Sequence, residues 1–353
     1  MRTAQRVRSG LRGWGGVGAM ATACVVALVF ALLLTCTGSV AHRPARSGAP
    51  AGPAGGGVAG AEQAVAAEDC TDPEKQTLAP SGDDGPAIEA IKNRPGEKRK
   101  LVVGIDQNSY RWGYRDANGP DSARLEGFDI DLVHRIAEDI LGDPDAVQFK
   151  AIPTDQRIPA IKDGRVDMVV RTMTINCDRI REVAFSAPYF RTGQQVLAPK
   201  SSPVKGYSTL ADRKICTATG STAYAKLAAD QEAGLLPRSA DIGTTVPNQL
   251  DCLVRLQLGE VDAVVTDAAL AASQAAQDPT VELKGDAFTT EYYGVAMKKD
   301  ANDLVRRVNR ILVDFREDTT GGWQDSYDTW LSATLGGDSS KSEPPAPAYL
   351  RTD

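Results

Sequence analysis

From residue 100 onward, short apolar runs alternate with segments whose apolar residues recur at helical spacing. Leu101–Ile105 (LVVGI) is a β-branched run typical of a buried strand, and 128–141 (FDIDLVHRIAEDIL) has the spacing of an amphipathic helix. A strand at 146–152 and a short helix at 156–164 follow, and the alternation continues to Asp267. Strands that alternate with helices predict βαβ units, and therefore α/β domains with largely parallel sheets.

One unit occurs twice in this pattern. Residues 158–174 and 251–269 each contain a helix, a glycine, the sequence VDxVV and a polar turn. Because ligands of open α/β sheets bind at the carboxyl ends of the strands, two such domains that face each other would form a binding cleft. The side chains expected in this cleft are Thr172, Thr174, Arg179 and Asp267.

The N-terminus has the pattern of an export signal. Residues 1–12 carry four arginines and no acid, and an apolar run follows at 19–34. The run ends at Cys36, in a sequence that resembles a lipobox except that Thr35 stands where Gly, Ala or Ser is usual. We keep three outcomes for 1–36 open: a signal peptide with lipidation of Cys36, a retained membrane anchor, and plain secretion. In all three, the rest of the chain lies outside the cytoplasm.

Two segments lack the apolar residues that a folded core needs. Residues 37–68 and 336–353 are rich in Ala, Gly, Pro and Ser and show no hydrophobic periodicity. Such segments cannot offset the entropy lost on ordering, so we predict a disordered tether and a disordered tail. Between them we expect an N-terminal extension at 69–97 and then the folded lobes.

The composition narrows the class of function. The chain has 353 residues, which suggests two domains, and a net charge of −6, which argues against nucleic-acid binding. With two histidines in the whole chain, a His-dependent catalytic or metal site is disfavoured. We therefore expect no catalytic residue, no metal and no cofactor.

Four cysteines, Cys70, Cys177, Cys216 and Cys252, follow the export signal. Outside the cytoplasm disulfides are the default, and four cysteines allow three pairings. We favour Cys216–Cys252 within one half of the chain. The remaining pair, Cys70–Cys177, would attach the N-terminal extension to the other half.

Four motifs in order carry a family resemblance. They are GFDIDLVHRIAEDI (127–140), MTINCDRIREVAFSAPYF (173–190), TGSTAY (219–224) and GEVDAVVTD (259–267). With these motifs the chain resembles the bacterial extracellular solute-binding proteins of family 3, which bind polar amino acids for ABC importers. The similarity is to the glutamate/aspartate-binding branch of actinobacterial type.

The resemblance implies a type II periplasmic-binding-protein-like α/β fold. Two lobes, 98–194 plus 293–335 and 195–292, would be joined by a two-segment hinge, with the ligand in the cleft between them. The chain should cross near Gln194–Ala198 and near Glu291–Ala296.

The resemblance also assigns roles in the ligand site. Arg179 matches the arginine that pairs with the α-carboxylate, and Thr222, beside Ser221, would donate to the same group from the other lobe. Asp267 matches the acid that accepts from the α-ammonium, with Thr172 and Thr174 beside it. The chain departs from the family pattern where Asn, Cys and Asp replace the usual Thr, Pro and Glu at 176–178. Tyr110, with Trp112 and Tyr114, is expected either at the wall of the pocket or in packing.

Arginines should determine the specificity for the side chain of the ligand. Arg157 matches the arginine that meets the distal carboxylate in the glutamate/aspartate branch, and Arg171 is a second candidate. Because a buried carboxylate needs a permanent cation, two arginines favour glutamate or aspartate, with glutamine or asparagine as the alternative. Asp106 stands where some acidic-ligand relatives have an arginine, and an ordinary helix-surface charge is the other interpretation of Arg157.

The predicted mechanism is hinge closure around the amino acid, followed by delivery to an ABC-transporter permease. A sensor subunit for a membrane signalling protein would use the same site without transport. A cleft enzyme, such as a cyclic-acid dehydratase, would need a free acid or base that the motifs do not supply. We expect a monomer that is held at the membrane by its N-terminus and binds no nucleic acid.

Overall fold

The computed structural model describes residues 70–116, 119, 124–337 and 343–352. The predicted export signal, the lipidation candidate Cys36 and the tether at 37–68 lie outside the described residues. No helix in the described part of the chain is long and apolar enough to cross a membrane.

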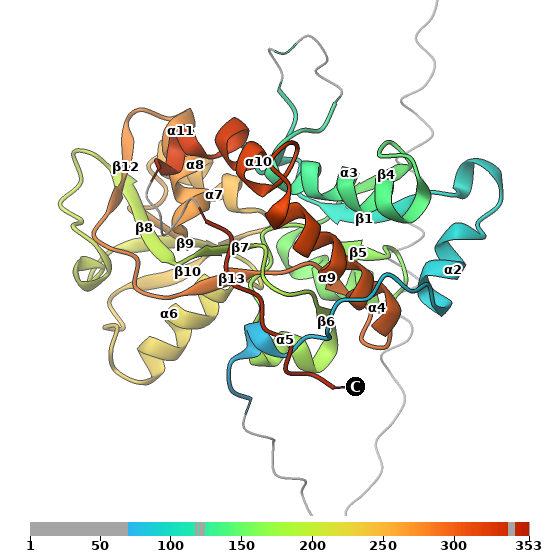
Figure 1. Ribbon diagram of the computed structural model, residues 1–353. Helices are drawn as coiled ribbons and strands as arrows, with labels where there is room; N and C mark the ends of the chain where they lie inside the picture. The colour runs from blue at the N-terminus through green and yellow to red at the C-terminus, as the bar shows by residue number, and fades with distance from the viewer. Residues whose placement is uncertain (1–69, 117–118, 120–123, 338–342, 353) are drawn as a thin grey trace, which may run out of the picture. The chain divides into compact units, whose positions relative to one another are not determined.

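The first of two five-stranded sheets has the strand order β4-β1-β5-β14-β6 (Figure 1). β1 is parallel to β4 and β5, and β14 is antiparallel to β5 and β6. We call this sheet lobe 1, together with the helices α2 (Pro86–Lys92), α3 (Phe128–Leu141), α4 (Arg157–Lys162), α5 (Cys177–Glu182), α9 (Asn302–Glu317) and α10 (Trp323–Trp330). Its strands are β1 (Leu101–Ile105), β4 (Val147–Ala151), β5 (Met168–Val169), β6 (Ala184–Phe185) and β14 (Ala296–Met297).

The second sheet repeats this arrangement in the order β10-β9-β11-β8-β12. β9 is parallel to β10 and β11, and β8 is antiparallel to β11 and β12. This sheet, with α6, α7 and α8, is lobe 2. Its elements are β8 (Gln194–Pro199), β9 (Lys214–Ala218), β10 (Asp241–Val246), β11 (Ala263–Asp267), β12 (Val281–Lys284), α6 (Thr222–Glu232), α7 (Gln249–Gln257) and α8 (Ala268–Gln277).

The duplicated sequence unit occupies the same place in both lobes. Helix α4 (Arg157–Lys162) leads into β5, and α7 leads into β11. Gly164 and Gly259, which follow these helices, have left-handed φ values of 66° and 69°, a conformation that costs glycine little. The repeat seen in the sequence is therefore a structural repeat.

The lobes are joined by a short antiparallel ladder between β7 (Phe190–Thr192) and β13 (Glu291–Tyr293). The expected second crossing, near Glu291–Ala296, includes β13. The first crossing lies a few residues before the expected Gln194–Ala198, because these residues pair with β11 and β12 as part of β8.

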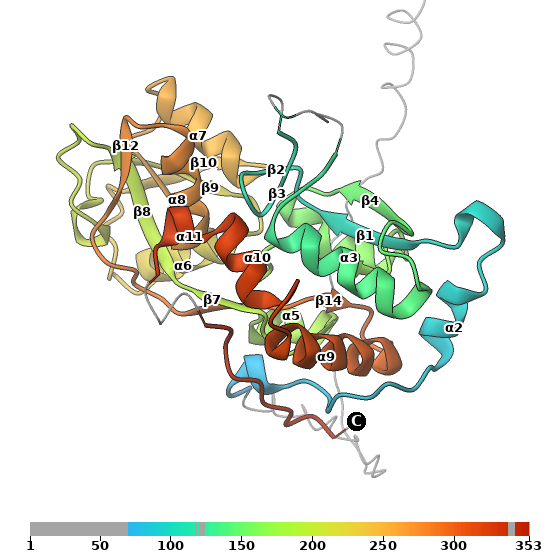
Figure 2. The same cartoon turned by 45° about the horizontal axis from the view of Figure 1, so that its top comes forward.

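Most of the remaining elements cover the first sheet or connect strands, and α11 (Ser332–Leu335) packs on α8 of lobe 2. The long helix α3 lies against α9 and α10, and α2 packs on α9 (Figure 2). These elements are α2 (Pro86–Lys92), α3 (Phe128–Leu141), α5 (Cys177–Glu182), α9 (Asn302–Glu317), α10 (Trp323–Trp330), α11 (Ser332–Leu335), β2 (Asn108–Ser109), β3 (Gly113–Tyr114), and the short 3₁₀ turns η1 (Pro73–Lys75), η2 (Gly96–Lys98), η3 (Thr154–Gln156) and η4 (Tyr207–Thr209).

Both favoured disulfides are present. Cys70–Cys177 joins the N-terminal extension to the start of α5, and Cys216–Cys252 joins β9 to α7 within lobe 2. The extension also packs on lobe 1, where the Thr77 hydroxyl donates to the Phe185 carbonyl at 2.7 Å.

The C-terminal segment differs from the predicted disordered tail. Residues 343–352 run beside the N-terminal extension (Figure 2), where the Arg351 amide donates to the Thr77 carbonyl at 3.1 Å. The Leu350 amide donates to the Lys75 carbonyl at 2.9 Å. Residues 343–352 are thus held by backbone hydrogen bonds to a neighbouring segment, and composition alone does not reveal such a partner.

Candidate functional site

A pocket lies where the carboxyl ends of the strands of the two lobes meet. The turns after β5 and β11 both line it, as the duplicated unit predicted. Seven of the nine predicted ligand-binding residues line this pocket; the exceptions are Tyr110 and Arg171. The lining residues are Arg157, Thr172, Thr174 and Arg179 from lobe 1 and Ser221, Thr222, Ala223, Gln249, Thr266 and Asp267 from lobe 2.

Arg179 is a buried cation presented by the short helix α5. Asn176 caps this helix, its side-chain oxygen accepting from the Arg179 amide at 2.9 Å. The guanidinium donates to the Thr174 carbonyl at 2.7 Å and, across the cleft, to the Gly220 carbonyl at 3.2 Å. No described carboxylate forms an ion pair with it, so the group is suited to bind an incoming carboxylate.

Two of the three departures from the family motif have structural explanations. Asn176 supplies the helix cap, and Cys177 forms the disulfide with Cys70. Both substitutions support the helix that carries Arg179 and leave its charge in place.

Asp267 ends β11 and, among the described residues, is the one carboxylate that lines the pocket. Its Oδ2 accepts from the Tyr293 hydroxyl at 2.7 Å. Burial, followed by repulsion from Glu291, raises the pKa of Asp267 to about 7, against the opposing effects of Tyr293, Arg179 and Arg157. A ligand ammonium group beside Asp267 would favour its charged form.

Thr172 lines the pocket from a strained turn. Its φ is 41°, an uncommon value for a residue with a branched side chain, and its amide donates to Asp129 Oδ2 at 3.1 Å. Asp129 also accepts from the Tyr189 hydroxyl at 2.9 Å. The first aspartate of the GFDIDL motif, Asp129, therefore fixes a pocket turn without lining the pocket itself.

Arg157 is buried, with 3% of its surface exposed, which excludes the alternative of an ordinary surface charge. Its Nε donates to the Thr154 carbonyl at 2.8 Å, and one terminal nitrogen lies 3.4 Å from the Arg171 carbonyl. Burial, followed by the nearby Arg179 and Arg171, lowers the pKa of Arg157. Within the described residues Arg157 has carbonyl partners and no carboxylate in ion-pair contact.

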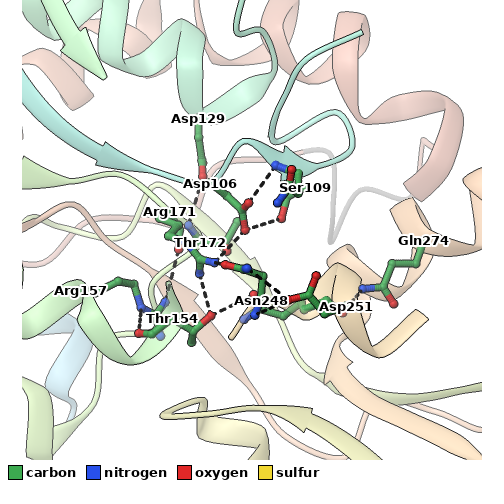
Figure 3. Close-up of polar contacts among 12 residues, drawn as sticks. Asp106, Ser109, Asp129, Thr154, Arg157, Arg171, Thr172, Asn248, Asp251 and Gln274 are labelled. Carbon is green, nitrogen blue, oxygen red and sulfur yellow. Dashed lines mark hydrogen bonds and ion pairs between the residues drawn. The ribbon is translucent and has the colours of Figure 1, made fainter. Parts of the chain in front are cut away.

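Arg171 has a different role from the one expected of it. It is fully buried behind the pocket, where it forms an ion pair with Asp106 at 2.8 Å and donates to Asn248 Oδ1 at 3.1 Å (Figure 3). Asp106, the residue that weakened the prediction of an acidic ligand, thus neutralises the second candidate arginine. The sequence could not show that these two side chains meet.

The predicted aromatic wall lies elsewhere. The ring of Tyr110 packs edge-on against Tyr114, with centroids 4.9 Å apart, and Arg111 lies over the same ring. Trp112 is fully buried in the core of lobe 1, against Phe128 and Phe190. For these three aromatic residues, the packing alternative describes the structure.

Three lining residues, Gln249, Thr266 and Ala223, were missed. Thr266 directly precedes Asp267 at the strand end and could have been found from that position. Gln249 begins α7 after the capping residue Asn248, a position with no chemical motif of its own. Among the described residues, no group of three or more His, Cys, Asp or Glu could hold a metal ion.

Comparison with known proteins matches this chain to a family of solute-binding proteins and to amino-acid-binding relatives. Residues 101–333 match the sequence profile of bacterial extracellular solute-binding proteins, family 3. The ABC transporter glutamine-binding protein GlnH of Bacillus subtilis is 34% identical over 234 residues, which cover 66% of this chain and 81% of that protein. The glutamate-binding protein GluB of Corynebacterium glutamicum is 30% identical over 284 residues, covering 76% and 88%.

A solved structure is similar along most of its length. The crystal structure of the solute receptor for L-cysteine of Neisseria gonorrhoeae matches with a TM-score of 0.62 and 26% identity, covering 70% of this chain and 95% of that one. The fold of the two lobes is thus found in a protein of known structure.

Proposed function

Because the chain belongs to the bacterial extracellular solute-binding proteins of family 3, we propose that it binds an acidic amino acid, glutamate or aspartate, and delivers it to an ABC importer. It is a binding protein and not an enzyme. The observation that carries the choice of ligand is the charge of the pocket, where two buried arginines face one buried aspartate.

The charges of the ligand complement those of the pocket. Glutamate has two carboxylates and one ammonium group, which match Arg179, Arg157 and Asp267 respectively. Glutamine would present a neutral amide to Arg157, and a buried charge without a partner is costly. Glu291, another buried carboxylate near Asp267, accepts from the Thr289 hydroxyl at 3.0 Å and is not a lining residue.

The rival ligand is glutamine, which the name of the Bacillus subtilis relative specifies. The name of the Corynebacterium glutamicum relative specifies glutamate. Similarity to these proteins therefore supports a five-carbon amino acid or its amide and does not choose between them, so the choice depends on Arg157.

Calorimetric titration of residues 65–353, the separate unit that contains both lobes, tests the proposal. We expect Arg157→Met to weaken glutamate binding by about 30-fold or more, the cost of truncating a buried charge pair. Glutamine binding should change by a few-fold. Arg165→Met, at an exposed arginine in the same region, is the matched control.

Equal losses for the two ligands, or tight glutamine binding that is insensitive to Arg157, would contradict the acidic ligand and leave the family assignment intact.

The mechanism that we propose is closure of the two lobes on the ligand. Contacts across the cleft support it: the Thr154 amide donates to the Pro247 carbonyl at 3.0 Å, and Arg179 donates to Gly220. Ligand bonds to both lobes exist together only when the lobes are closed, so a ligand shifts the population toward that state.

Import and sensing are distinguished in the cell. Deleting the gene should abolish high-affinity glutamate uptake if the protein serves an importer. A sensor subunit would leave uptake unchanged and alter the phosphorylation of a membrane signalling protein.

We further propose that the N-terminus, through Cys36 or the apolar run before it, holds the protein at the membrane. Cys36→Ala tests the lipid anchor, since it should release the protein into the medium or leave it unlabelled by fatty acid.

A further inference from the structure

A buried network of hydrogen bonds and one ion pair connects the two lobes next to the ligand pocket (Figure 3). It begins at Asp106, whose carboxylate is 2.8 Å from Arg171 and also accepts from the Asn108 amide at 2.9 Å. Arg171 then donates to the Thr154 hydroxyl oxygen at 3.0 Å and to Asn248 Oδ1 at 3.1 Å. The network therefore runs from the strand ends of lobe 1 to the first residues of α7 in lobe 2.

Arg171 constrains which groups donate and which accept in this network. An arginine side chain only donates, so the oxygens of Asn248 and Thr154 that face it must accept. The Asn248 Nδ2 group is left to donate to Asp251 Oδ2, at 3.2 Å. The Thr154 hydroxyl proton is left to donate to Gln249 Oε1, also at 3.2 Å. Because Gln249 Oε1 accepts this proton, the amide lies with its oxygen toward Thr154.

The donor end of Gln249 remains available. Its Nε2 has no hydrogen-bond partner within the described part of the chain, and the residue lines the pocket together with Arg157. Both side chains therefore offer N–H groups to the pocket and no acceptor.

We propose that Gln249 determines specificity by donating to a side-chain oxygen of the bound amino acid, and that Arg171 and Thr154 are positioning residues that fix its polarity. The assignment rests on the proposed function and deepens it. A ligand carboxylate can accept from both Arg157 and Gln249. A carboxamide has one acceptor and one donor group, and its donor would face donors. The network thus favours a ligand carboxylate over a ligand amide because the pocket offers only donors there, in addition to the effect of charge.

The ratio of the glutamate and glutamine dissociation constants, measured by calorimetry, tests this role. Gln249→Glu replaces the donor with an acceptor, and we expect the ratio to move about tenfold or more toward glutamine. Thr154→Val removes the hydroxyl that orients the amide, without a change of charge, and should move the ratio a few-fold in the same direction. Gln324→Glu, at an exposed residue on α10, adds the same charge elsewhere and should leave the ratio unchanged.

The outcomes are distinguishable. Equal weakening of both ligands in Gln249→Glu and Thr154→Val would indicate a purely structural role and overturn the assignment while the proposed function stands. If Gln249→Glu does not fold, as judged by circular dichroism, Thr154→Val alone decides. Failure of the unsubstituted protein to bind either ligand would refute the proposed function and this assignment with it.

Discussion

Ligand binding should release a proton below about pH 7, because Asp267, the carboxylate that we propose receives the ligand ammonium, is partly protonated in that range. Burial, and then repulsion from Glu291, raises the pKa of Asp267 to about 7 in the ligand-free cleft. A bound ammonium group stabilises the charged form and returns the pKa toward its ordinary value. Since the folded, ligand-free state holds the proton more tightly, affinity is lost as pH falls through this pKa.

The size of the effect follows from one titrating group. With a pKa near 7, Asp267 is about three-quarters ionised at pH 7.5 and about 3% ionised at pH 5.5, so affinity should fall about 25-fold between these values. The carboxylates and ammonium of glutamate itself barely change their charge in this range. Calorimetry in buffers of different ionisation enthalpy should detect nearly one proton released per ligand at pH 6.

Two substitutions should move the midpoint in opposite directions. Glu291→Gln removes the repelling charge and lowers the pKa of Asp267, so the loss of affinity begins at lower pH. Tyr293→Phe removes the hydrogen bond that stabilises the charged form, so the loss begins at higher pH. An affinity that stays constant from pH 5.5 to 7.5 in the unsubstituted protein would refute the reasoning.

Two further predictions concern closure and the disulfide. At Gly220 φ is 72° and a Cβ would lie 3.0 Å from the Asp155 Cα across the cleft, so Gly220→Ala should lower ligand affinity about tenfold. Gly234→Ala, where φ is 74° and nothing lies within 4 Å, should lower thermal stability without affecting binding; equal binding in the two variants would contradict the closure argument. Replacing Cys70 and Cys177 by Ser should lower the free energy of unfolding by about 2–5 kcal/mol in urea titrations, and an unchanged midpoint would show that the extension contributes no stability.

Local pattern predicted the elements well where a periodic segment packs against a sheet. The expected helix at 128–141 coincides with α3 (Phe128–Leu141), and the repeated unit led to two lobes of the same topology. The pattern was sufficient because the buried face of such a helix repeats along the chain itself. The ordered segment at 343–352 carries no comparable signal, since the backbone groups that its amides pair with, at Lys75 and Thr77, are more than 250 positions away.

The sequence motifs identified the charged residues of the site. Whether each one lines the pocket depends on whether it forms an ion pair elsewhere in the fold. Arg179 and Asp267 line the pocket as the resemblance implied. Arg157 and Arg171 looked alike in sequence, yet Arg157 lines the pocket and Arg171 is neutralised by Asp106. That difference depends on which strand ends are neighbours in the sheet, a property of the fold and not of the local sequence. Gln249 was missed because its orientation depends on partners contributed by the other lobe.

Both ends of the folded part of the chain are fixed to the same lobe. The disulfide attaches Cys70 to lobe 1, and residues 343–352 lie beside the extension on that lobe, whereas lobe 2 is a single insertion between β7 and β13. A pull on the chain ahead of Cys70 is therefore passed to α5 and does not act on the hinge. For the same reason, fluorophores fused at the two termini would report little of the closing motion, and a useful optical sensor of the ligand would need one of them inserted in a loop of lobe 2.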